Sequence, residues 1–189
     1  VLVSEMRDQE TSEIGLRAAM TGHFVLSTLH TNDSISSAMR LIDMGAEPFL
    51  VASALTAILA QRLVKRVCED CVRAHELTDQ ERVWLRGLGP KASVALQADA
   101  KFVRGAGCYQ CGNSGYKGRV GVYELLEMNE DLLDALRRGD QSEFTHAARK
   151  TPLYRPLALS ALDYALKGIT SLDEVFRITA SLADAGFSE

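Results

Sequence analysis

The chain has 189 residues, 47% of them hydrophobic, so it is long enough for one to three modules with a buried core. Its 21 lysines and arginines stand against 25 aspartates and glutamates, and the net charge of -4 argues against a nucleic-acid-binding surface, which is usually basic. No apolar run reaches the roughly 18 residues of a membrane-spanning helix, and no secretory signal pattern is present. We therefore expect a cytoplasmic protein that binds no nucleic acid.

The first 45 residues alternate between short apolar runs and helical patterns. Val1–Val3 and 24–29 are predicted strands, because each is a mainly apolar run that stops at polar residues. A helix is predicted after each strand, at 11–20 and from Asp33 to Gly45, since glycine follows each helical pattern and polar N-cap residues precede the second. This order predicts a βαβα unit.

A longer helix is predicted to begin at Pro48, because proline is favoured in the first turn of a helix. Apolar residues recur at helical spacing from Val51 through Leu55 to Leu63. We therefore expect this helix to continue towards the basic residue Lys65.

The four cysteines form two Cys-x-x-Cys pairs, Cys68/Cys71 and Cys108/Cys111, and the chain has no other cysteine. Two such pairs supply the four thiolates of a closed, structural zinc site. The 36 residues from 72 to 107 exceed the roughly 15 to 20 of the common spacing, so an element must fold between the pairs, and a capping-box pattern at Thr78 predicts a short helix there. Two disulfides or a redox Cys-x-x-Cys are the alternatives.

After the second cysteine pair, the chain returns to a strand and then becomes helical. The run 119–126 has the apolar and β-branched residues of a strand, with Gly118 before it. Helices are then predicted at 131–138, 142–150, 156–167 and 172–183.

Two residues that could carry chemistry stand at the ends of the first two predicted strands. In a right-handed βαβ unit both strands run the same way, so Glu5 and His30 should emerge at the same carboxyl edge of the sheet. Nucleotide hydrolases use an acid after an apolar strand near Mg²⁺ and the attacking water, and a neighbouring histidine can contact the terminal phosphate. The alternative is a solvated glutamate in a loop and a histidine that bonds a nearby carbonyl.

Five segments of the chain resemble the type II/type IV secretion ATPases, the motors of type II secretion and type IV pilus assembly. The first two look like the Walker B and histidine-box region of that family, and the others follow in the family's order across nearly the whole chain. The segments are Val1–Thr11, Thr21–Asp33, Ala60–Cys68 with the two cysteine pairs, Ser114–Glu124 and Gly168–Val175.

The resemblance implies an α/β fold, the C-terminal half of a RecA-like P-loop ATPase core with an inserted tetracysteine element and a C-terminal helical subdomain. The core would occupy residues 1–66 and return as the strand 119–128. The zinc-binding element would be 67–118, and the helical subdomain would be 129–189.

The resemblance also assigns roles to single residues. Glu5 matches the Walker B glutamate, and His30 matches the histidine near the γ-phosphate, with His23 as the other histidine of that stretch. Arg7 and Asp8 match the charged pair after Walker B, for which a role in loop geometry or subunit contact is expected, beside a plain surface ion pair. The four cysteines match the ligands of a structural zinc.

The sequence contains no Gly-x-x-x-x-Gly-Lys-[Ser/Thr] loop, the element that holds phosphates in this class of ATPase. We therefore expect about half of an ATP site, and no ATP turnover by this polypeptide alone. The resemblance implies that the intact protein is an Mg²⁺- and ATP-dependent homo-hexamer, peripheral to the bacterial inner membrane and in contact with secretion or pilus platform proteins. The four cysteines are typical of the secretion and pilus-extension branch. The alternative function is a zinc-stabilised docking module without catalysis.

Overall fold

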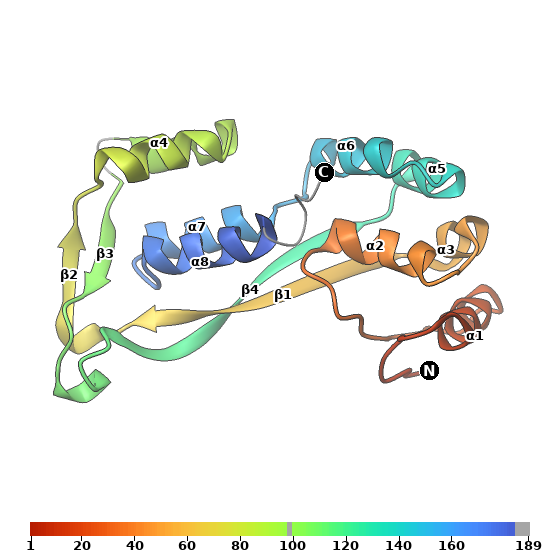
Figure 1. The fold of residues 1–189 in the computed structure, drawn as a ribbon, viewed down its shortest axis with the longest axis horizontal. Helices are drawn as coiled ribbons and strands as arrows, with labels where there is room; N and C mark the ends of the chain where they lie inside the picture. The colour runs from red at the N-terminus through yellow and green to blue at the C-terminus, as the bar shows by residue number, and fades with distance from the viewer. Residues whose placement is uncertain (98–99, 184–189) are drawn as a thin grey trace. The chain divides into compact units, whose positions relative to one another are not determined.

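The structure, a computed structural model, describes residues 1–97 and 100–183. The chain divides into two compact units, of which unit 1 comprises Val1–Ala60 and Glu124–Tyr154, and unit 2 comprises Gln61–Tyr123 and Arg155–Glu189. The helices of unit 1 are α1 (Gln9–Met20), α2 (Ser34–Asp43), α3 (Pro48–Ala54), α5 (Glu130–Arg138) and α6 (Gln141–Lys150) (Figure 1). Those of unit 2 are α4 (Asp79–Gly87), α7 (Leu157–Leu166) and α8 (Leu172–Ala183), with the short strands β2 (Val72–His75) and β3 (Phe102–Gly105).

Unit 1 is built around α3, which packs against α1, α2 and α5, while α6 packs against α5 and α2. Asp33 caps α2, as the sequence predicts, and Asp8, which was not predicted as a cap, caps α1; each side chain accepts a backbone N–H of the first turn. Gly22 and Gly45 follow α1 and α2 with positive φ, as expected of glycines that end helices. The predicted helices 11–20 and 33–45 are therefore confirmed to within a few residues.

The two predicted strands at the start of the chain form a short parallel pair. Leu2 and Leu26 make a parallel bridge, and the Val3 N–H donates to the Leu26 carbonyl at 2.9 Å. An apolar run such as Val1–Val3 would suit a buried strand, but one face of the pair is exposed: Leu2 is 78% exposed and Leu26 54% exposed. Val3 packs against the core of unit 1, because alternate side chains of an extended segment point to opposite faces.

The long helix predicted from Pro48 towards Lys65 is wrong in its second half. Helix α3 ends at Ala54, Leu55 is extended, and the following residues form the strand β1 (Ala57–Val67). Strand β1 pairs with β4 (Tyr116–Glu127). At one end of the pair Met128 N–H donates to the Thr56 carbonyl, and at the other end Cys68 N–H donates to the Gly115 carbonyl, so the two strands are antiparallel. This segment is a strand and not a helix because pairing with β4 satisfies its backbone N–H and C=O groups. The strand predicted at 119–126 corresponds to β4.

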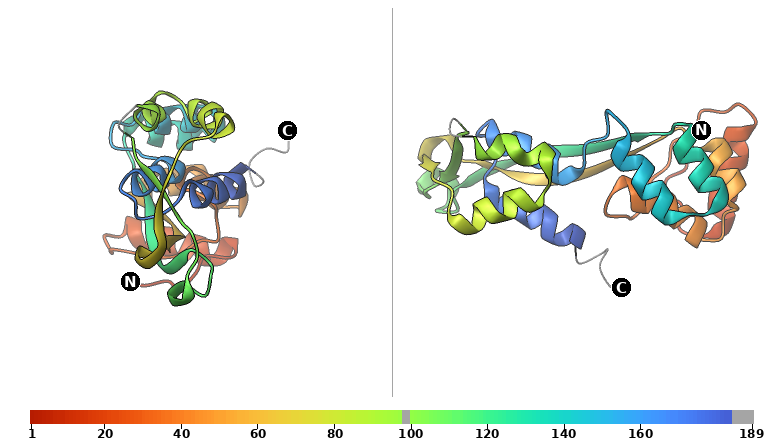
Figure 2. Two further views of the ribbon diagram at one scale, coloured as in Figure 1. Left: turned by 90° about the vertical axis from the view of Figure 1, so that its left-hand side faces the viewer. Right: turned by 90° about the horizontal axis from the view of Figure 1, so that it is seen from above.

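Unit 2 combines a helical pair with a small antiparallel sheet. Helices α7 and α8 pack side by side, as the two blue helices of Figures 1 and 2 show. Strands β2 and β3 pair antiparallel, with Val72 opposite Gly105 and His75 opposite Phe102. Its fully or nearly fully buried apolar residues include Val64, Leu85, Phe102, Val122, Leu157, Leu162, Leu172, Val175 and Ile178.

The predicted domain division differs from the observed units. The helices expected to form one C-terminal subdomain at 129–189 fall in both units, α5 and α6 in unit 1 and α7 and α8 in unit 2. This follows from packing, since α5 contacts α3 while α7 contacts α8 and β3. Among the residues described, no helix combines the length and apolar character needed to cross a bilayer.

Helix α4 begins with the predicted capping box. Thr78 Oγ1 accepts the Glu81 N–H at 3.3 Å, and Glu81 Oε2 accepts the Thr78 N–H at 2.8 Å. Glu81 also lies 2.8 Å from His75 Nε2. Burial alone would raise the pKa of Glu81, but the hydrogen bonds from Thr78 and His75 outweigh it and hold the pKa below its usual value.

Glu81→Ala should therefore lower the free energy of unfolding by about 1 to 3 kcal/mol at pH 7, since it removes the capping box and the His75 contact. A lowered carboxyl pKa stabilises the fold above the ordinary value of 4.5, and this contribution disappears as the pH falls through the lower folded value. The difference in the free energy of unfolding between Glu81→Ala and the wild type should therefore shrink as the pH falls below about 4.5. Urea unfolding followed by the fluorescence of Trp84, the single tryptophan, measures it. Equal unfolding of Glu81→Ala and of the exposed control Glu76→Ala would contradict the prediction.

Candidate functional site

Glu5 and His30 follow the two paired segments of unit 1 and lie together. Because the pairing is parallel, both segments leave it at the same end. His30 Nε2 lies 3.1 Å from Glu5 Oε1. The Glu5 side chain is 16% exposed and that of His30 is 88% exposed, so a largely covered carboxylate stands beside an imidazole in solvent. The structure thus brings together the two residues that the strand order predicts at one edge.

Arg7 and Asp8 have different places in this site. Arg7 Nε donates to Glu5 Oε2 at 2.6 Å, and this hydrogen bond is the main reason that the pKa of Glu5 lies below its usual value. Asp8 accepts the Thr11 N–H at 2.8 Å as the N-cap of α1, and the same bond lowers the pKa of its carboxyl. Arg7 therefore favours the ionised form of Glu5, while Asp8 fixes the start of the helix that follows.

His23 is not brought to the Glu5–His30 pair. It precedes the second paired segment, whereas His30 follows it. The His23 ring lies instead 3.2 Å from Thr21 Oγ1, at the end of α1. The two ends of this segment are separated by its extended length.

The second site is formed by the four cysteines of unit 2, whose Sγ atoms all lie within 4.8 Å of one another. The Sγ distances are 3.9 Å between Cys68 and Cys108, 3.9 Å between Cys71 and Cys111, and 3.7 Å between Cys108 and Cys111. Zinc–sulfur bonds of about 2.3 Å in a tetrahedron require sulfur atoms about 3.8 Å apart. The four side chains therefore fit a zinc ion, and these separations are far longer than the roughly 2.05 Å of a disulfide.

The thiols of Cys68 and Cys111 differ in their acidity. Burial raises the pKa of the Cys68 thiol to about 12. Burial acts in the same direction on Cys111, but the N–H groups of Cys108 and Gly115 donate to its sulfur at 3.2 Å and 3.3 Å, and with the neighbouring thiols they lower its pKa to about 6. Backbone N–H groups aimed at sulfur favour a thiolate, the form that binds metal.

Close backbone contact holds the two cysteine pairs together. The Ala106 N–H donates to the Cys71 carbonyl at 2.9 Å, next to the pairing of β2 with β3. Gly105 and Gly115 approach so closely that a Cβ on Gly105 would lie 1.9 Å from the Gly115 carbonyl oxygen. Glycine is therefore required at Gly105 by this contact.

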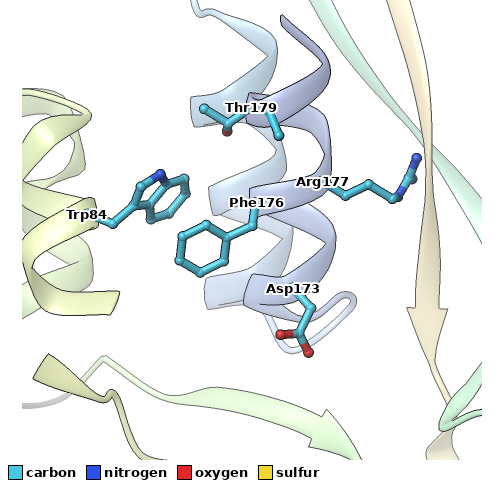
Figure 3. Close-up of a pocket in the computed structure, with 6 residues that line it drawn as sticks. Trp84, Asp173, Phe176, Arg177 and Thr179 are labelled. Carbon is cyan, nitrogen blue, oxygen red and sulfur yellow. The ribbon is translucent and has the colours of Figure 1, made fainter. Parts of the chain in front are cut away.

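A groove of about 450 Å³ lies between α4 and α8 on unit 2. Figure 3 shows the rings of Trp84 and Phe176, which line it, next to each other, and their ring centroids are 3.9 Å apart. Arg177 points away from these rings and donates to the Leu63 carbonyl and to Glu174. The groove contains neither a cysteine nor a member of the Glu5–His30 pair.

Glu124 is a buried charged residue that the sequence pattern does not single out. It was assigned only to a strand, yet its side chain is buried and accepts hydrogen bonds from Ser34, at the start of α2. A charged residue at an inward position of an otherwise apolar strand was the available signal, because Val122 and Leu126 lie on the same buried face.

Sequence comparison matches residues 1–177 to the family model described as "Type II/IV secretion system protein". The chain is 41% identical over 181 residues to type II secretion system protein E of Aeromonas hydrophila, covering 95% of this chain and 34% of that protein. It is 42% identical over 180 residues to the type IV pilus assembly ATPase PilB of Thermus thermophilus, covering 95% of this chain and 20% of that protein. The chain thus spans about a third or less of the length of these relatives.

Two solved structures have a similar fold. The pilus retraction motor PilT with bound ADP has a TM-score of 0.60 at 22% identity, over 94% of this chain and 38% of PilT. The ATPase DotB of Legionella pneumophila has a TM-score of 0.60 at 23% identity, over 95% of this chain and 38% of DotB. At these identities the likeness shows the fold alone, and it confirms the predicted α/β class. Since the family model covers all but the last few residues, the chain belongs to the type II/IV secretion system protein family.

Proposed function

We propose that this chain is the C-terminal part of a hexameric ATPase that hydrolyses ATP to power type II protein secretion or type IV pilus assembly. The observation that carries the proposal is the 3.1 Å contact between Glu5 and His30 at the same end of two parallel segments. The proposal is supported by relatives such as the type II secretion system ATPase E of Vibrio cholerae, which is 41% identical over 95% of this chain.

The chemistry proposed for unit 1 is attack of water on a terminal phosphate. Glu5, whose ionised form is favoured by Arg7, accepts a hydrogen bond from the attacking water and orients it. His30 offers an N–H donor to the phosphate oxygens from its exposed ring. Glu5 would also help to hold Mg²⁺, which neutralises charge on the phosphates when bound. Asp8 takes part only by fixing the start of α1, and His23, whose ring lies beside Thr21, is given no role in this reaction.

The proposed role of the four cysteines is a structural zinc site. Support comes from sulfur separations of 3.7 to 3.9 Å, which suit tetrahedral coordination. Four protein ligands leave no open position for water, so the metal would stabilise unit 2 and take no part in hydrolysis. We assign the chain to the secretion and pilus-extension branch because of these cysteines.

The intact protein is proposed to act in the cytoplasm, peripheral to the bacterial inner membrane, together with platform proteins of the secretion or pilus machinery. Support comes from the names of the relatives, which are secretion and pilus assembly proteins. A net charge of -4 fits a partner other than nucleic acid.

A second candidate is a docking module held together by zinc, without catalysis. It is favoured by unit 2, which is compact in itself and contains the cysteine cluster but neither Glu5 nor His30. The two functions make opposite predictions for ATP hydrolysis by the full-length protein.

The full-length protein from the complete gene should hydrolyse ATP only with Mg²⁺, and His30→Ala should lower kcat by roughly 10- to 100-fold, because one donor to the developing phosphate charge is lost. Phosphate release under saturating ATP measures this. The matched control is His146→Ala, an exposed histidine on α6, which should stay at the wild-type rate. The polypeptide 1–189 alone should show no turnover. A full-length protein without Mg²⁺-dependent hydrolysis would favour the docking module instead.

A further inference from the structure

Glu124 is a buried carboxylate with an uncommon set of partners. Its side chain is 2% exposed, on the inward face of β4. Glu124 Oε1 accepts the backbone N–H of Ser34 at 2.9 Å and also accepts the Ser34 hydroxyl. The two residues are 90 positions apart in sequence, so this contact joins β4 to the first residue of α2 within unit 1.

A carboxylate so deeply buried costs free energy unless its oxygens accept hydrogen bonds. The start of α2 provides hydrogen-bond donors for this carboxylate, because the first N–H groups of a helix have no partner within the helix and carry partial positive charge. Asp33 accepts the Ser36 N–H at 2.7 Å, and Glu124 accepts that of Ser34. Tyr154 is also buried, and burial together with the neighbouring Glu124 carboxylate raises the pKa of its phenol.

The anchored end of α2 is continuous with the segment that carries His30. Only Thr31 to Asp33 lie between His30 and Ser34. Thr31 Oγ1 lies 2.5 Å from Ser37 Oγ, and Ser37 Oγ donates to the Asp33 carbonyl at 2.7 Å, so the connecting residues are tied to the first turn of α2. A displacement of Ser34 therefore reaches the imidazole through a short and hydrogen-bonded connection.

We propose that Glu124 is a positioning residue for ATP hydrolysis: by binding Ser34 it fixes the start of α2 and thereby holds His30 beside Glu5. The expected effect on kcat rests on the proposed function, whereas the anchoring of α2 by Glu124 does not depend on it. In this proposal Glu124 acts on His30 through α2.

Glu124→Met in the full-length protein tests this, because methionine keeps most of the side-chain volume but cannot accept the Ser34 N–H. Hydrogen exchange of the peptide covering 31–37 should become about tenfold faster, since a hydrogen bond to a charged group is lost. Misplacement of His30 should lower kcat by about tenfold or more and change the KM for ATP by less than about threefold. Glu124→Gln retains an acceptor oxygen and should recover most of both losses.

Two variants separate positioning from general stability. Leu126→Ala, a fully buried residue two positions along the same strand, should lower the melting temperature without the kcat loss at a temperature well below melting. Glu127→Met, exposed on the same strand, should change nothing. Unchanged exchange at 31–37 in Glu124→Met overturns the anchoring, and faster exchange with wild-type kcat overturns the positioning role. Absence of hydrolysis in the wild-type protein would count against the proposed function alone, since the exchange experiment still decides on the anchor.

Discussion

Cys68→Ser should remove a stoichiometric zinc ion from the protein and unfold the tetracysteine element at 67–118 before the rest of the chain. One zinc per chain should be found in the wild type by elemental mass spectrometry, and limited proteolysis should cut within this range after complete chelation or in the variant. The expected loss is large, because binding to structural Cys₄-type sites contributes on the order of 10 kcal/mol to folding.

The size of this effect follows from how little else stabilises the element. Among its described residues, Leu85 and Phe102 are the only large apolar side chains that are buried apart from Val67, which belongs to β1. Strands β2 and β3 have four residues each, and an isolated pair of that length is marginal in water. A metal bound by the four cysteines would therefore take the place of an apolar core in this part of unit 2.

The matched control for Cys68→Ser is Tyr109→Ser, inside the second cysteine pair, where the side chain is 95% exposed. It should keep its zinc and its resistance to protease. Zinc affinity should also fall as the pH falls, because protons compete for thiols such as Cys68, whose pKa lies near 12 without metal. Unchanged circular dichroism and proteolysis after complete zinc removal would contradict the stabilising role.

Local chemistry decided which parts of the fold could be predicted. The N-cap of α2 at Asp33 and the capping box of Thr78 depend on side chains within three residues of the backbone group that they bind, so the sequence reveals them directly. The segment after Ala54 could not be assigned in this way. Leu55, Leu59 and Leu63 are four apart, a spacing that fits one face of a helix and, being even, also one face of a strand. The distant partner strand β4 decided between the two.

The residues of the candidate sites likewise differ in whether the sequence alone could group them. Glu5 and His30 could be paired from sequence because the handedness of a βαβ unit places both at one sheet edge. The cysteines could be grouped by their spacing alone. The contact of Glu124 with Ser34 joins residues 90 positions apart, and no local pattern indicates it. His23 was grouped with His30 because the two are close in sequence. It lies at the other end of the extended segment, beside Thr21.

Glu5→Gln in the full-length protein should abolish most ATP hydrolysis and leave ATP binding close to wild type. Glutamine keeps the size of the side chain and an acceptor oxygen, but it is neutral and cannot take up a proton from the attacking water. Loss of such a group typically lowers kcat by about 10² to 10⁴-fold. Single-turnover phosphate release and binding of a fluorescent ATP analogue measure the two quantities separately.

The control for Glu5→Gln is Glu10→Gln, an exposed acid in the first turn of α1, which should hydrolyse ATP at the wild-type rate. Arg7→Ala adds a test by pH. The Arg7 hydrogen bond lowers the pKa of Glu5, so wild-type Glu5 stays ionised to lower pH, and without Arg7 the acid limb of the pH–rate profile should move to higher pH. Full activity in Glu5→Gln would contradict a role for Glu5 in the reaction. An unshifted pH–rate profile in Arg7→Ala would contradict only the proposal that Arg7 lowers the pKa of the catalytic Glu5.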